Sequence, residues 1–135
     1  MMKICICCSL TFTNEVLALA GELEKLGHEL LLPNSVMNRA IERADFDPVK
    51  TKAETDAVRK HIDKIKQSDA ILVCNYDKKG IANYIGANTF IEIAAAHYHH
   101  KPIFALNPLP DQPYIHDEIE SFDITILNGD LSKIK

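Results

Sequence analysis

The sequence predicts an α/β fold: a doubly wound, five-stranded parallel sheet with helices on both faces. Short apolar runs alternate with helix-patterned segments about five times along the 135 residues. Such alternation is typical of parallel strands joined by helical crossovers. Two of the runs, at residues 3–8 and 70–74, are almost wholly apolar, as strands buried on both faces are. Right-handed crossovers then favour the strand order 2-1-3-4-5.

The first elements are a strand, a helix and a second strand. Residues 3–8 predict the first strand because Ile and Cys fill it. Thr13 or Asn14 can cap the helix that follows, and Gly27 is a natural stop for it. Residues 28–32 then predict the second strand, which ends before a proline.

The next part of the chain is less regular. Residues 34–50 show no clear period, and a short helix is one interpretation of their apolar positions. Residues 51–54 have the spacing of a capping box, which predicts the start of a helix. The single apolar stripe of that helix consists of Val58, Ile62 and Ile65, so its other sides are expected to face solvent.

The second half of the chain completes the alternation. A long polar loop at residues 75–86 precedes a helix at residues 88–100. This helix is apolar on several sides, so we expect another subunit or neighbouring helices to cover more than its sheet-facing side. The remaining predicted elements are strands at 70–74, 102–106 and 124–127 and a short helix at 114–121. Together they predict a flavodoxin-like sheet.

Composition narrows the class of protein. The chain has 15 Lys and Arg against 19 Asp and Glu, a formal net charge of −4, whereas a nucleic-acid-binding surface needs a basic face. No apolar run approaches the roughly 20 residues that cross a bilayer, and the first residues lack the pattern of a signal peptide. We therefore expect a cytoplasmic protein without nucleic-acid or membrane partners. Because no linker or repeat divides the chain, residues 1–135 are predicted to form a single domain.

The four cysteines admit two interpretations. A metal site would pair Cys5 and Cys7 with histidines among residues 97–100, since Cys5 and Cys7 share one face of a strand and Cys8 points to the other. Zinc-binding cysteines, however, usually lie on turns with about two to four residues between them. The spacing favours reduced thiols acting as small core residues. We therefore predict no metal and no cofactor.

The carboxyl ends of the strands are where ligands bind in a doubly wound sheet, near the point at which strand order reverses. Here that edge carries the loops at residues 9–13, 75–86 and 107–113. These loops also hold polar residues with no obvious structural role. Asn107, just beyond the fourth strand, is placed to line the site.

The segment from Asn83 to Glu92 has the features of a ligand site. Gly86 permits a sharp turn or a close approach of the backbone to a ligand. A helix that begins at Asn88 or Thr89 would present free backbone N–H groups to an anion. Glu92 follows in the first turn, where a carboxylate could attack a sugar carbon. The spacing of Thr89 and Glu92 also matches a capping box, so spacing alone leaves both roles open.

The order of motifs resembles one enzyme family. An Asn-Thr-x-x-Glu helix start at residues 88–92 is followed by three alanines and then by Lys101-Pro102. This series is similar to that of the nucleoside 2-deoxyribosyltransferase family and its nucleotide N-hydrolase relatives. The loop with Ser9 and Phe12 also resembles the first loop of the family, which helps to hold the sugar or phosphate.

The resemblance implies a function. Glu92 would be the nucleophile that attacks C1′ of a (deoxy)nucleoside or nucleoside monophosphate, and water or a second base would complete hydrolysis or transfer of the N-glycosidic bond. The small-molecule partner would be that nucleoside or nucleotide. The resemblance also implies a homodimer or higher homo-oligomer, in which Asn128 reaches a neighbouring subunit's site.

Two positions depart from the family pattern. The family often has an aspartate that handles the base at the position of Gly86, and a helix glycine at the position of Ala94. Asp77, Asn75 or Tyr84 could replace the missing aspartate. The full set of predicted substrate-binding residues is Ser9, Phe12, Asn75, Asp77, Tyr84, Gly86, Asn88, Thr89 and Asn107.

Two other functions fit the same scaffold. A nucleotide-binding or sensor module without turnover is favoured by the absence of an acid at Gly86. A flavin-binding protein would need a phosphate loop after the first strand, and residues 9–13 contain hydroxyl groups but no glycine.

Overall fold

The computed structural model describes residues 1–33 and 56–135. The short helix considered within residues 34–50 and the capping box at residues 51–54 lie outside these described residues. Within them, no helix is long and apolar enough to cross a membrane.

The sheet has the predicted form. All pairings between its five strands are parallel, and the order is β2-β1-β3-β4-β5. The fold class and the strand order 2-1-3-4-5 are therefore confirmed. The strands are β1 (Lys3–Cys8), β2 (Glu29–Leu31), β3 (Ala70–Cys74), β4 (Ile103–Ala105) and β5 (Ile124–Ile126).

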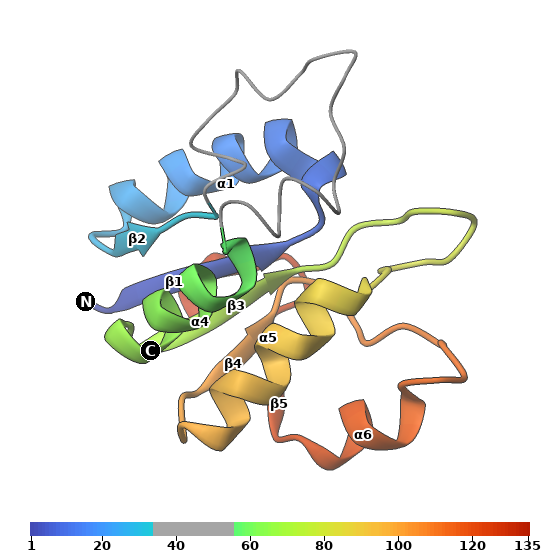
Figure 1. The fold of residues 1–135 in the computed structure, drawn as a ribbon. Helices are drawn as coiled ribbons and strands as arrows, with labels where there is room; N and C mark the ends of the chain where they lie inside the picture. Colours follow the sequence, from blue (N-terminus) through green and yellow to red (C-terminus); the bar gives the residue numbers. More distant parts are fainter. Residues whose placement is uncertain (34–55) are drawn as a thin grey trace.

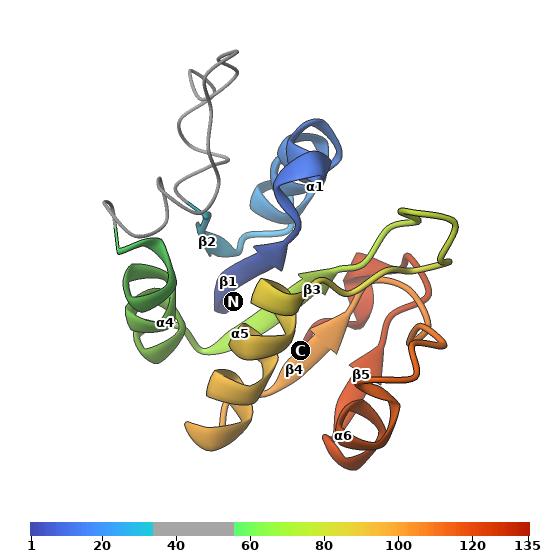
Figure 2. The same cartoon turned by 45° about the vertical axis from the view of Figure 1, so that its right-hand side comes forward.

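Helices cover both faces of this sheet (Figure 1). Helix α1 (Thr13–Lys25) and the C-terminal turn η3 (Leu131–Lys133) lie on one face. On the other face lie α4 (Ala57–Gln67), α5 (Ala87–Tyr98) and the short α6 (His116–Ser121) beside β5, as the rotated view in Figure 2 shows. Helix α5 packs against α4 and against β1, β3 and β4, so it is the central helix of its face.

The alternation of side chains along β1 assigns its residues to two cores. Ile4 and Ile6 pack with α1, whereas Cys5 and Cys7 belong to the core on the α4 and α5 face. All four are fully buried, because a central parallel strand is covered on both sides. The prediction that the four cysteines are core residues is confirmed for Cys5, Cys7 and Cys74, whereas Cys8 at the end of β1 is only partly buried.

Two helices begin at other residues than the sequence predicts. Helix α1 is preceded by the 3₁₀ turn η1 (Leu10–Phe12), so Phe12 occupies the cap position and Thr13 is already helical. Helix α5 begins at Ala87, with Gly86 at the cap position, rather than at Asn88 or Thr89. The predicted stop of α1 is confirmed, since Gly27 has a φ of +93° just beyond the helix, a conformation that favours glycine.

Candidate functional site

Hydrogen bonds join the three loops at the carboxyl edge of the sheet. The Lys78 ammonium, in the loop after β3, donates to the Ser9 hydroxyl after β1 at 2.9 Å. The Gln112 side chain, after β4, accepts from the Ile85 N–H at 2.8 Å and donates to the Ile85 carbonyl at 2.9 Å. The loops predicted to gather at this edge therefore do so (Figure 1).

The strongest link between two of these loops is the Asn75–Asn107 pair. The Asn75 side chain accepts from the Asn107 N–H at 3.0 Å and donates to the Asn107 and Pro108 carbonyls, both at 3.0 Å. The Asn107 side chain donates back to the Asn75 carbonyl at 2.9 Å. Asn75 is fully buried, so its amide holds the two loops together. Contact of either residue with a ligand remains a prediction.

Replacing Asn75 by alanine should destabilise the protein. The change leaves the Asn107 N–H and two carbonyls without their partner in a part-buried place, which costs about 1 kcal/mol. Thermal unfolding followed by circular dichroism measures this loss. The matched control is Gln67→Ala at an exposed position of α4, which should leave the melting temperature nearly unchanged. Equal melting temperatures for the two variants would show that the loop link does not stabilise the fold.

The loop after β3 folds back as a tight turn. Lys78 and Ile81 bond to each other through their backbones, at 3.0 and 2.9 Å, and Lys79 and Gly80 between them both have positive φ. The turn brings the Lys78 and Lys79 ammonium groups to 5.6 and 5.7 Å from the Tyr84 ring centroid, within range of a cation–π contact. Two cations therefore lie over one aromatic ring at the edge of the site.

Other predicted binding residues in these loops have internal contacts. The exposed Asp77 accepts from the Asn83 N–H at 2.9 Å, which closes the loop. Phe12 is 6% exposed and contacts Tyr76 edge-to-face, with ring centroids 5.1 Å apart. Ser9 also approaches the Thr11 hydroxyl at 3.2 Å. Phe12 is thus a core residue, while Asp77 and Ser9 lie where a ligand could reach them.

The start of α5 does not form the capping box that the sequence permits. Thr89 lies inside the helix and is 3% exposed, and the cap residue, Gly86, has no side chain with which to cap the helix. Glu92 is therefore in the second turn of α5, and its carboxylate is not the cap of that helix. Gly86 has a φ of −79°, which any residue can adopt, and a close approach of its backbone to a ligand remains a prediction. An added Cβ would meet the Tyr84 ring at 3.4 Å.

Glu92 points instead toward α4. Its Oε2 atom lies 3.5 Å from Nε2 of His61, and the two side chains are 13% and 6% exposed. His61 is the residue that sequence reasoning missed, although it lies three residues after Val58 and four before Ile65, on the apolar stripe of α4. This position could have indicated His61 from the sequence, because a polar residue on a buried stripe needs a partner.

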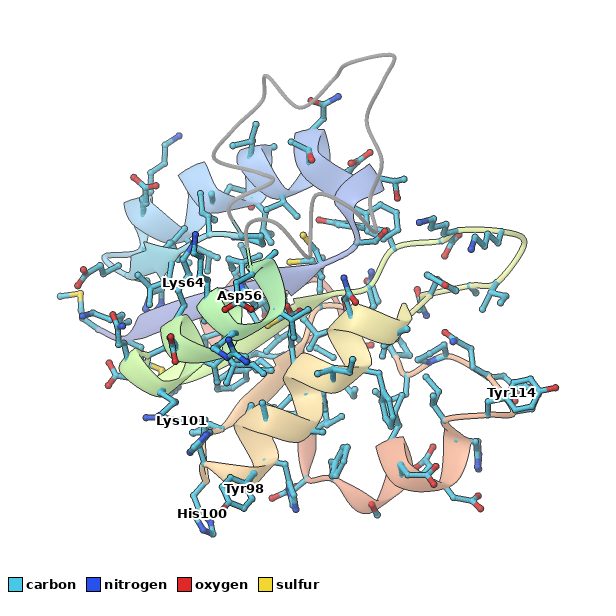
Figure 3. All side chains as sticks on the ribbon, viewed as in Figure 1. Asp56, Lys64, Tyr98, His100, Lys101 and Tyr114 are labelled. Carbon is cyan, nitrogen blue, oxygen red and sulfur yellow. The ribbon has the colours of Figure 1, made fainter. Side chains whose placement is uncertain are left out.

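The same His61 atom contacts two cysteines of β1. Nε2 lies 3.5 Å from the Cys5 sulfur and 3.6 Å from the Cys7 sulfur. All three ligand atoms lie within 4.8 Å of one another. The histidines that the sequence offered as alternative partners are elsewhere: His97 packs on Phe122, and Figure 3 shows His100 just beyond the C-terminal end of α5.

Mutual contact changes the protonation of these groups. The hydrogen bond with Cys7 lowers the pKa of Cys5 to about 6, against the effect of burial and with help from His61. Burial raises the pKa of the Cys7 thiol, and the negative charges of Cys5 and Glu92 raise it further. Burial disfavours the charged form of His61, but contact with Cys5 and the charge of Glu92 outweigh it, so the pKa of His61 is raised. The cluster thus concentrates negative charge around one imidazole.

Comparison with known proteins supports the fold. A solved structure of a 2-deoxyribosyltransferase from the psychrotolerant bacterium Bacillus psychrosaccharolyticus resembles this chain with a TM-score of 0.58 and 18% sequence identity. The alignment covers 90% of this chain and 92% of that one. No protein-family model and no curated protein matches the sequence. The doubly wound fold implied by the family resemblance is therefore confirmed.

Proposed function

We propose that this protein cleaves or transfers the N-glycosidic bond of a (deoxy)nucleoside or nucleoside monophosphate, with Glu92 as the nucleophile. The observation that carries the proposal is the place of Glu92, in the second turn of the helix that follows β3, on a fold shared almost end to end with a 2-deoxyribosyltransferase. That enzyme is described as a biocatalyst for the synthesis of antiviral and antitumoral nucleosides.

The surroundings of Glu92 are consistent with this role. Glu92 does not cap α5, because Gly86 is at the cap position and Glu92 lies in the second turn. It is 13% exposed beside His61, so it is largely shielded from water but not sealed. A carboxylate in such a place can attack C1′ of a ribosyl group, breaking the C1′–N bond so that the base leaves and a covalent glycosyl intermediate forms. Water or a second base then releases the sugar.

A nucleoside monophosphate is the substrate class that the loop cations favour. Lys78 and Lys79 are held near Tyr84, and Lys78 also reaches Ser9 at the end of β1. A phosphate would be attracted to this pair of charges and could accept a hydrogen bond from the Ser9 hydroxyl. Asp77 and Tyr84 in the loop after β3, and Asn88 at the start of α5, are the residues we propose to contact the base or sugar. We also propose a cytoplasmic homo-oligomer.

The direct experiment is an assay of base release. The purified protein is incubated with each deoxynucleoside, each ribonucleoside and their 5′-monophosphates, and free base is measured by chromatography, with and without a second base as acceptor. We expect release from at least one substrate, and more from monophosphates than from nucleosides. If nucleotides raise the melting temperature but no base is released, the protein is a binding module and the proposed reaction is wrong.

A further inference from the structure

We propose that three side chains between β1 and α4, those of Cys5, Cys7 and His61, form a binding site for a thiophilic divalent cation of the zinc type. Nε2 of His61 lies 3.5 Å from the Cys5 sulfur and 3.6 Å from the Cys7 sulfur. The two sulfurs and the nitrogen lie within 4.8 Å of one another.

The distances between these atoms are those of ligands around a common ion. Zinc binds sulfur at about 2.3 Å and imidazole nitrogen at about 2.0 Å, and tetrahedral angles then separate the two ligand atoms by about 3.5 Å. The observed sulfur–nitrogen separations are 3.5 and 3.6 Å. The Glu92 carboxylate oxygen lies 3.5 Å from the same nitrogen, but it is outside the group of three and so lies beside the site.

The donor set also selects the ion. Two thiolates with an imidazole suit zinc or another thiophilic metal and suit Mg²⁺ and Ca²⁺ poorly. A divalent cation would neutralise the two thiolates that it binds. Cys5 and Cys7 are fully buried and His61 is 5% exposed, as in closed structural sites. The spacing rule for cysteines on turns misses this arrangement, because the two ligands come from one face of a strand.

Bound metal would hold His61, whose Nε2 atom lies 3.5 Å from the carboxylate that the proposed reaction uses. The metal would bind whether or not the protein cleaves nucleosides. The cobalt titration measures binding of the ion, so a failure to bind metal is distinguishable from a failure to cleave nucleosides.

Cobalt(II) is the probe, because it reports both its ligands and its coordination number. Reduced, chelator-treated full-length protein is titrated with Co²⁺, and the bound Co²⁺ is then displaced by Zn²⁺. We expect one equivalent, with a thiolate charge-transfer band and the intense visible bands of four-coordinate cobalt. Binding without a thiolate band, or no binding of either ion, would overturn the site.

Variants separate this cluster from other thiols of the chain. Cys7→Ser should weaken Zn²⁺ binding by more than the roughly 10- to 100-fold that loss of a supporting group costs. Cys8→Ser is the matched control, because Cys8 is the next residue and packs on the opposite face. An equal loss of affinity in both would refute the assignment. If Cys7→Ser does not fold, His61→Gln replaces it, and unchanged zinc affinity in that variant would also refute the site.

Discussion

Replacing Glu92 by glutamine should reduce base release by at least about 1,000-fold, since removal of a nucleophile leaves only binding and electrostatic effects. The amide has nearly the same shape and can still accept a hydrogen bond from His61, which lies 3.5 Å from the native carboxylate. The fold should therefore be retained. The rate is measured under single-turnover conditions with the best substrate of the panel, in the presence of a metal chelator.

The matched control for this variant is Glu118→Gln. It makes the same chemical change at an exposed position of α6, so base release should stay within about twofold of the native rate. Circular dichroism spectra and melting curves of both variants establish that they are folded. Native-like turnover by Glu92→Gln would exclude Glu92 as the nucleophile, even if the protein proved to be an N-glycosidase.

The largest loss of stability is expected in the central strand. Leu72 lies in the middle of β3 with no exposed surface and packs in the core between the sheet and α1. Leu72→Ala removes buried apolar volume and leaves a cavity, which costs about 3 kcal/mol. For a domain of this size the melting temperature should fall by about 10 °C. Urea unfolding at equilibrium gives the free-energy difference directly.

The control for Leu72→Ala is the same substitution at Leu26, which is 48% exposed at the end of α1. Less apolar surface is lost there, so the cost should stay below about 1 kcal/mol. If both substitutions cost the same, the core of this face is not packed as described.

The sheet could be predicted from the sequence because each strand carries its own signal. Residues 70–74 are apolar throughout, and β3 spans the same residues. The strand order followed from the handedness of crossovers, which depends on chain geometry rather than on particular side chains. Helix starts were less predictable. Thr13 has the side chain of a cap, but the preceding 3₁₀ turn moves the cap position back to Phe12.

The sequence predicts where the site lies better than it predicts which side chains contact one another there. That three loops would meet at one edge follows from parallel strands, and the Lys78–Ser9 bond is an instance of it. The contact between Glu92 and His61 joins residues that are far apart in the sequence and lie on two helices. No local pattern encodes how two helices rotate against each other. The Asn75–Asn107 pair was missed as a pair for the same reason, although both residues were singled out.

The face that Cys5 and Cys7 share on β1 has a consequence for oxidation. Residues two apart on one strand have Cβ atoms about 6.6 Å apart, whereas a disulfide needs about 3.5 to 4.5 Å. β1 is held on both sides, by β2 and by β3, so it cannot bend to close that gap without losing ladder hydrogen bonds. The strand therefore prevents a disulfide between Cys5 and Cys7, although the two thiols are neighbours and the pKa of Cys5 is about 6.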